Sequence, residues 1–151
     1  MNALVSKSWL MAMAWSLLVG VASARADDCD AVTKTFQAQQ KTPWRMLFQG
    51  MELMIHIGDA TYMRNDNEWT RMPNTVAATM AGGGRYTECK AVGHESVDGT
   101  ATDVYEYKSA VKGATGQAAR VWIGTSDGLP HRWEVGNKVE TFSYKDVKAP
   151  R

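Results

Sequence analysis

Between residues 44 and 144 the sequence alternates apolar with polar side chains, and turn residues interrupt it about every ten positions. A period of two is typical of β-strands with one buried face. The segments that show it are 44–48, 51–57, 61–64, 68–71, 86–97, 100–108, 117–123, 129–135 and 139–144. Because no helical segment separates most of these strands, we expect an antiparallel sheet built from hairpins. Asp98-Gly99, between two alternating segments, is the strongest hairpin turn.

One segment has helical spacing instead. Residues 28–41 place Cys29, Val32 and Phe36 on a common face, and Pro43 ends the segment. A helix beside so many strands leaves two architectures open, either a sandwich or closed barrel, or a sheet that curls around the helix. We favour the second, an α+β fold in which a curved antiparallel sheet forms an incomplete β-barrel over the N-terminal helix. A single helix covers only part of such a sheet and leaves apolar surface on its concave face.

The first 26 residues have the features of an export signal. Lys7 precedes an apolar run from Trp9 to Ala22, which is shorter than a membrane span, and Ala24-Arg25-Ala26 matches a signal-peptidase site. We therefore expect cleavage after Ala26 and a mature protein outside the cytoplasm. The remaining residues, 27–151, suit one domain.

The charge balance excludes some partners. The chain has 17 basic and 16 acidic residues, and Lys7 and Arg25 would leave with the signal, so the mature protein carries a net charge near −1. Such a chain gives no electrostatic reason to bind nucleic acid or anionic lipid. No second apolar stretch is long enough to cross a bilayer, so the mature protein is not expected to span a membrane.

Cys29 and Cys89 are the two cysteines of the chain. In an oxidising compartment they are most simply a disulfide, which would stabilise the fold by about 4 kcal/mol for a loop of this size. Lipidation of Cys29 is an alternative, but Asp27 and Asp28 stand where that processing site requires small apolar residues. Without a CxxC motif or a neighbouring histidine, a redox or metal role is not expected.

Enzymatic motifs are absent from the sequence. His56, His94 and His131 stand singly on strand-like segments, and no nucleophile motif accompanies them. The run Gly82-Gly83-Gly84 lacks the lysine and hydroxyl residue of a phosphate loop, so we interpret it as a flexible connector. We predict no enzyme. A small hydrolase is an alternative that requires one of these histidines beside a carboxylate in a cleft.

Six methionines remain after cleavage, at positions 46, 51, 54, 63, 72 and 80. On a strand, Met54 and His56 share a side while Met51 faces away, which leaves two ligands and no predicted metal or other cofactor. Methionine is flexible and polarisable, and it suits apolar surfaces that adapt to variable partners. Together with the large aromatic residues, these methionines either fill the core or line a cavity between helix and sheet.

The second half of the chain resembles a known family. Val-Trp-Ile-Gly at 121–124 followed by Asp-Gly-Leu-Pro-His-Arg-Trp-Glu at 127–134 is similar to the strand–turn–strand of LolA-like proteins, the outer-membrane lipoprotein-sorting family. Val-Asp-Gly-Thr at 97–100, with Val-Tyr-Glu-Tyr at 104–107, fits the preceding hairpin of that family. The segment 141–147 fits its last strand.

The resemblance implies an unclosed β-barrel over helices and a hydrophobic cavity that holds acyl chains in the periplasm. We therefore predict a periplasmic, non-catalytic carrier or binding protein whose ligand is a lipid or the acyl chain of a lipoprotein. Residues 74–84 would form a lid with Gly82, Gly83 and Gly84 as its hinge. Alternatively, the same groove binds another envelope protein, as a stress-sensing module would. The residues expected to line the cavity are Trp44, Met46, Phe48, Leu53, Ile55, Met63, Trp69, Tyr105, Tyr107, Trp122, Trp133 and Phe142.

Overall fold

The structure is a computed structural model that describes residues 26–73, 85–109 and 116–151. Residues 1–25, which hold most of the expected export signal, lie outside this range, and so do the expected lid and its hinge Gly82–Gly84. The described part contains one helix, α1 (Ala26–Gln39). No helix in this part of the chain has the length and apolar character needed to cross a membrane.

Nine strands occur in the described residues, close to the segments that the alternation predicts. They are β1 (Trp44–Phe48), β2 (Met51–Ile57), β3 (Ala60–Asn65), β4 (Glu68–Arg71), β5 (Tyr86–Val97), β6 (Thr100–Ser109), β7 (Gln117–Gly124), β8 (Pro130–Val135) and β9 (Lys138–Ser143). They form one antiparallel sheet in the order β4-β3-β2-β1-β9-β8-β7-β6-β5. The sheet is open, with β4 and β5 as its edges. The predicted α+β fold, a helix against an unclosed antiparallel sheet, is confirmed.

A pairing between distant parts of the chain unites the sheet. Strands β1 to β4 form one set of consecutive hairpins and β5 to β9 form another, and the two sets meet where β1 pairs with β9. In this pairing Met46 lies opposite Phe142, and Phe48 lies opposite Glu140. The first and last strands therefore lie side by side at the centre of the sheet.

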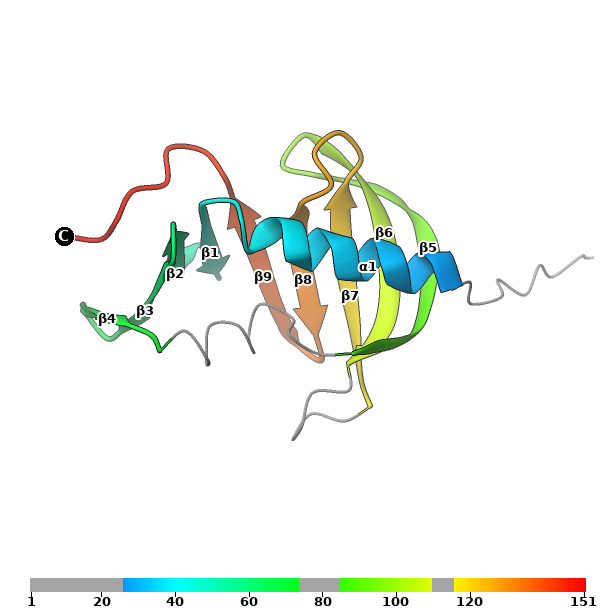
Figure 1. Cartoon of the computed structure of the whole chain (residues 1–151), viewed down its shortest axis with the longest axis horizontal. Helices are drawn as coiled ribbons and strands as arrows, with labels where there is room; N and C mark the ends of the chain where they lie inside the picture. Colours follow the sequence, from blue (N-terminus) through cyan, green and yellow to red (C-terminus); the bar gives the residue numbers. More distant parts are fainter. Residues whose placement is uncertain (1–25, 74–84, 110–115) are drawn as a thin grey trace, which may run out of the picture.

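Helix α1 packs on one face of the sheet, which we call the inner face. It crosses β5 to β9 in Figure 1, while β1 to β4 lie beyond its C-terminal end. Val32 and Phe36 are the buried apolar residues that the helix presents to the sheet. A disulfide joins Cys29 of α1 to Cys89 of β5, with the two Cα atoms 5.0 Å apart, so the predicted pairing is confirmed.

The register of the strands identifies the other residues of the inner face. Val121 packs against the helix, and it lies opposite Tyr105 on one side and Trp133 on the other. The same row continues through Glu140 on β9 to Phe48 on β1. Since directly opposite residues of an antiparallel pair point to the same side, this row marks the inner face across five strands.

Candidate functional site

Two separate apolar clusters lie on the inner face. The first, the helix cluster, joins α1 to strands β5 to β8. Its buried members are Val32, Phe36, Cys89, Tyr107, Ala119, Val121 and Ile123. Cys29, Tyr86, Tyr105, Trp133 and Val135 pack around them. This cluster is the ordinary core between a helix and a sheet, because helix residues occupy its centre.

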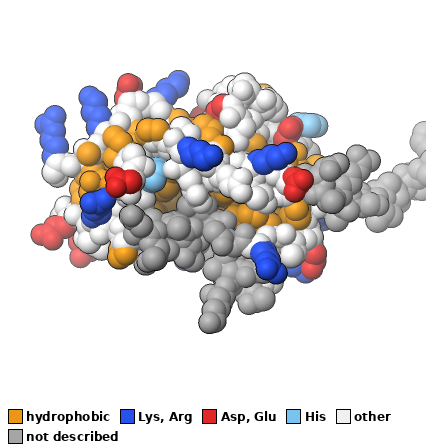
Figure 2. Space-filling model, viewed as in Figure 1, with side chains coloured by type: hydrophobic (Ala, Val, Ile, Leu, Met, Phe, Trp, Pro, Cys, Tyr) orange, Lys and Arg blue, Asp and Glu red, His pale blue; other side chains and the backbone are white. Residues whose placement is uncertain are grey.

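The second cluster, the methionine cluster, lies on the half of the inner face beyond the helix. Its buried members are Trp44, Met46, Met54 and Met72, and Leu53, Met63, Phe142 and Tyr144 pack against them. The main contacts of α1 are with β5, β6 and β8, whereas the methionine cluster stands mostly on β1, β2, β3 and β9. Figure 2 shows hydrophobic side chains gathered along both sides of α1 on this face of the molecule.

Trp44 is the most firmly held aromatic residue of the methionine cluster. Its ring stacks on His56 at a centroid distance of 5.5 Å and meets Phe142 edge-on at 5.8 Å. The imidazole is fixed in turn, because Nδ1 bonds to the Thr61 hydroxyl at 2.9 Å and Nε2 bonds to the Gln40 carbonyl at 3.0 Å. The indole therefore has one defined orientation at the end of α1.

Two polar hydrogen-bond donors are buried beside these apolar side chains. Trp44 is 5% exposed and Gln39 is 2% exposed. Neither Trp44 Nε1 nor Gln39 Nε2 finds a hydrogen-bond acceptor among the described residues. The Gln39 amide lies close to the Tyr144 hydroxyl, which donates its own hydrogen to the carbonyl of Pro130, but the amide and this hydroxyl do not meet the geometry of a hydrogen bond. A buried donor without a partner is uncommon in folded proteins, so these two groups are notable features of the inner face.

Glu140 is an acidic residue on the inner face between the two clusters. It lies opposite Trp133 and Phe48, and Phe142 follows it on the same side of β9. Its carboxyl makes no ion pair or hydrogen bond with any residue that the structure describes. Burial raises the pKa of Glu140, and the nearby Lys138 only partly opposes this shift.

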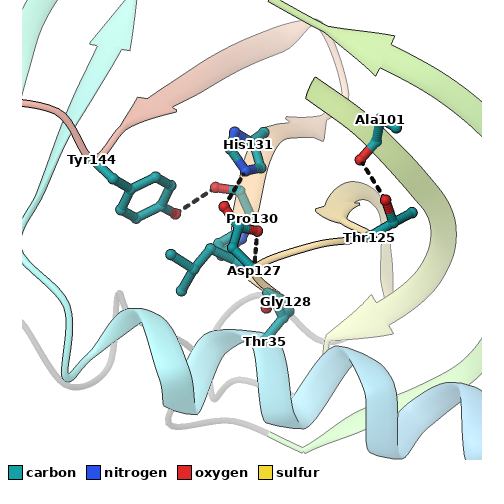
Figure 3. A network of polar contacts seen from close by, with 9 residues as sticks. Thr35, Ala101, Thr125, Asp127, Gly128, Pro130, His131 and Tyr144 are labelled. Atoms are coloured by element: carbon teal, nitrogen blue, oxygen red, sulfur yellow. Dashed lines mark hydrogen bonds and ion pairs between the residues drawn. The ribbon is translucent and has the colours of Figure 1, made fainter. Parts of the chain in front are cut away.

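A polar network in the β7–β8 turn holds one residue of the methionine cluster in place (Figure 3). The Asp127 carboxylate accepts a 3.0 Å bond from the Leu129 backbone N–H and lies 3.0 Å from His131 Nε2. The His131 ring packs edge-on against Tyr144 at 5.6 Å, and the Tyr144 hydroxyl donates to the Pro130 carbonyl. The turn thus positions Tyr144 at the border of the cluster.

The structure brings together only part of the predicted cavity lining. In or against the methionine cluster are Trp44, Met46, Leu53, Met63 and Phe142. In or against the helix cluster are Tyr105, Tyr107 and Trp133, and Phe48 shares their face by register. Ile55, Trp69 and Trp122 lie on the opposite face of the sheet. That any of them contacts a ligand stays a prediction.

Trp122 illustrates how a large apolar residue is accommodated on the outer face. It is 2% exposed and packs against Val97 and Val104. The Arg132 guanidinium lies 4.6 Å from the centre of its ring, and its indole N–H donates a 2.8 Å bond to Glu95. A cation over the ring and a satisfied N–H explain why this tryptophan is stable away from the helix.

The predicted cavity lining omits four residues of the site, namely Met54, Met72, Tyr144 and Gln39. For two of them a usable signal was present. Met54 shares its side of β2 with His56, opposite Ile55, and this parity places it with Trp44. Gln39 follows Thr35 and Val32 on one helix face at spacings of four and seven residues. Met72 follows β4 with no comparable pattern.

The histidines differ in their surroundings. His94 Nδ1 lies 2.6 Å from Asp103, and His131 lies beside Asp127, while no carboxylate in the described part of the chain is bonded to His56. Within the described residues no hydroxyl or thiol group is hydrogen-bonded to the ring of His94 or His131. The same residues contain no group of three His, Cys, Asp or Glu side chains arranged to hold a metal.

Solved structures of other proteins resemble this chain. The crystal structure of the lipoprotein LppX from Mycobacterium tuberculosis matches with a TM-score of 0.49 and 12% identity, over 83% of this chain and 97% of that one. The crystal structure of MucB matches with a TM-score of 0.44 and 12% identity, over 83% of this chain and 61% of MucB. The chain is similar in structure to both.

This chain therefore corresponds to less than two thirds of the length of MucB. No protein-family model matches the sequence, and no curated protein matches it either. Similarities as distant as these describe the arrangement of the helix and the sheet, and they do not transfer a function to this chain.

Proposed function

We propose that this protein binds an apolar ligand, a lipid or the acyl chain of a lipoprotein, at the methionine cluster on the inner face of the sheet. The observation that carries the proposal is the position of this cluster beyond the main contacts of α1. The helix covers one apolar cluster of the concave face, and the methionine cluster is separate from it. A ligand could therefore bind beside the helix without displacing it. The sequence resemblance to LolA-like proteins favours the same function.

The composition of the cluster suits such a ligand. Met46, Met54, Met63 and Met72 have unbranched side chains that rearrange at low cost around chains of different shape. Burying each methylene of a ligand contributes about 0.8 kcal/mol, so six methylenes would supply about 5 kcal/mol before the cost of ordering the ligand. No covalent step is required, and shielding the ligand from water is the proposed activity.

We place this activity in the periplasm, as a protein exported by the N-terminal signal and cleaved after Ala26. The disulfide between Cys29 and Cys89 supports a location outside the cytoplasm, because such bonds persist in oxidising compartments. The charged residues that surround the sheet give the mature chain no strong net charge, in keeping with an apolar ligand.

The test compares two methionines under the same substitution. Met63 packs against the cluster, whereas Met51 on the neighbouring strand is 57% exposed. Met63→Glu should weaken binding of a fluorescent C12 fatty-acid methyl ester at least tenfold, because it puts a carboxylate into the apolar site, and Met51→Glu should leave binding unchanged. Circular dichroism and thermal unfolding establish that both variants fold.

Native mass spectrometry of the protein purified from a cell-envelope extract provides an independent test. Co-purified lipid, retained by the wild type and Met51→Glu but lost from Met63→Glu, supports the proposal. Equal probe binding by both variants, or none by the wild type, contradicts it. A bound envelope protein with no lipid would favour the protein-binding alternative for the same face.

A further inference from the structure

We infer that the ligand carries a neutral carbonyl group, of an ester or an amide, next to its alkyl chain, and that Trp44 Nε1 and Gln39 Nε2 donate hydrogen bonds to this oxygen. The inference rests on the proposed function and specifies the class of ligand. The two donors define a polar position at the edge of the methionine cluster. No motif in the sequence indicates such a position.

Burial without a partner is the first part of the case. Gln39 and Trp44 are at least nine-tenths buried, and neither side-chain N–H has an acceptor among the residues that the structure describes. A buried N–H group that has lost its water and gained no protein partner destabilises the folded state. We therefore expect such a group to have a function, such as binding a ligand. Two such donors within six residues of each other call for a shared explanation.

Their location is the second part. Gln39 is the last residue of α1, Trp44 is the first residue of β1, and a turn closed by the Thr42 N–H to the Gln39 carbonyl, at 3.1 Å, connects them. Tyr144 lies close to the Gln39 amide and also packs against the cluster that contains Trp44. Both donors therefore border the methionine cluster at the point where the helix ends.

The chemistry of the two groups selects the ligand. The indole nitrogen of Trp44 can only donate, so its partner must be an acceptor. A carbonyl oxygen has two lone pairs and can accept from both groups at once. A free carboxylate is a poorer fit, because burying its charge beside the apolar side chains of the cluster costs far more than burying a neutral carbonyl. Met46, Met54 and Phe142 would then surround the alkyl chain attached to the carbonyl carbon.

Matched probes test the inference. We would compare binding of methyl dodecanoate, N-methyldodecanamide and the ether 1-methoxydodecane, which lacks the carbonyl, by displacement of a fluorescent C12 probe. The wild type should bind the ester or the amide about tenfold more tightly than the ether, which is the discrimination expected of one or two hydrogen bonds. A preference for the ester indicates a glycerolipid, and a preference for the amide indicates an N-acylated lipoprotein.

Two variants then assign the effect to the donors. Trp44→Phe keeps the ring and removes the N–H, and it should reduce the tenfold preference to less than about threefold while ether binding changes little. Gln39→Met removes the second donor with similar volume, and it should lower the preference in the same way. Trp122→Phe is the control, because its indole N–H is bonded to Glu95 on the outer face. It should retain the full preference.

Thermal unfolding of the unliganded variants gives a second readout. Trp44→Phe removes no hydrogen bond and should not lower the melting temperature on that account, whereas Trp122→Phe should lower it. Equal binding of ester, amide and ether by the wild type overturns the inference and leaves the proposed function intact. Absence of binding of all three probes overturns both. If Trp44→Phe fails to fold, retention of the preference in Gln39→Met overturns the inference.

Discussion

The hydroxyl of Thr35 in α1 donates a 2.7 Å hydrogen bond to the backbone carbonyl of Gly128, a residue 93 positions later in the chain (Figure 3). Thr35 is 2% exposed and Gly128 is exposed, so the bond is shielded from water on the side of the helix alone. It attaches the helix to the β7–β8 turn, the same turn in which Asp127 and His131 are paired. Helix position and turn conformation therefore depend on each other.

Thr35→Val should lower the free energy of unfolding by about 0.5–1.5 kcal/mol, because valine has the same shape but cannot donate a hydrogen bond to the Gly128 carbonyl. Urea unfolding measures the change. Thr33→Val is the control, since the Thr33 hydroxyl bonds to the Cys29 carbonyl within the same helix, and this variant should lose much less stability. Equal losses in the two variants would contradict a specific role of the bond to the turn.

Gly124→Ala should destabilise the protein by about 1–3 kcal/mol. A methyl group at position 124 would collide with the Asp127 carboxylate and lie 2.8 Å from His131 Nε2. Both side chains are held by their mutual contact and by the Leu129 N–H, so they can move only by breaking these bonds. Differential scanning calorimetry checks the loss.

Gly93→Ala is the matched control for this change, because a methyl group at Gly93 on β5 would meet no atom within 4 Å. Its melting temperature should stay equal to that of the wild type or rise slightly, since alanine restricts the unfolded chain. A loss of the same size at both glycines would show that the contact with Asp127 and His131 is not the cause.

Glu140→Gln should make the protein more stable at neutral pH. Burial raises the pKa of Glu140 in the folded state above its ordinary value of 4.5, so folding favours the protonated carboxyl. The ionised form is therefore costly, and wild-type stability should fall as pH rises from the ordinary value through the raised one. Glutamine has no such transition. Urea unfolding of both proteins at pH 3 and pH 7 should show equal stability at pH 3 and higher stability of the variant at pH 7.

Glu68→Gln at the exposed edge strand β4 controls for the general effect of removing a negative charge. It should change stability little at either pH. If Glu140→Gln has no advantage at pH 7, or if its advantage is as large at pH 3, then ionisation of Glu140 is not what destabilises the wild type.

Removing the disulfide should cost about 4 kcal/mol of unfolding free energy, the value expected for a loop of 60 residues. The double variant Cys29→Ala/Cys89→Ala and the reduced wild type should unfold at the same urea concentration. Denatured wild-type protein kept without reductant should show no titratable thiol. Two free thiols under that condition would contradict the bond between α1 and β5.

Local patterns predict most of the sheet, and the Asp98-Gly99 turn shows why. Both residues have positive φ, 48° for Asp98 and 80° for Gly99, which is the backbone that this dipeptide favours in a two-residue hairpin. Local patterns do not predict that β1 pairs with β9, because the two strands are almost a hundred residues apart and no turn connects them. The predicted helix, 28–41, is shifted by two residues from α1, which covers Ala26–Gln39. Asp28 therefore lies inside the helix, where its carboxylate accepts a hydrogen bond from the Ala91 N–H of β5.

The candidate site is less predictable, because size and hydrophobicity do not report the side of the sheet. Val121 and Trp122 are neighbours in the chain, so they face opposite sides, and only Val121 meets the helix. In a strictly alternating strand one of two neighbouring residues would be polar and would mark the outer face. Here both residues are apolar, so the sequence does not show which of them faces the helix. The unpaired donors on Gln39 and Trp44 depend on what surrounds them in three dimensions, and this is not encoded in any short segment.

The helix is fastened at both of its ends. Cys29 holds its first turn to the edge strand β5 by a covalent bond, and at its other end only a few residues separate Gln39 from the central strand β1. It therefore cannot swing away from the sheet to admit a bulky molecule while this bond is intact. A ligand of the proposed kind would therefore reach the inner face from the side of β2, β3 and β4, where the main contacts of α1 do not extend.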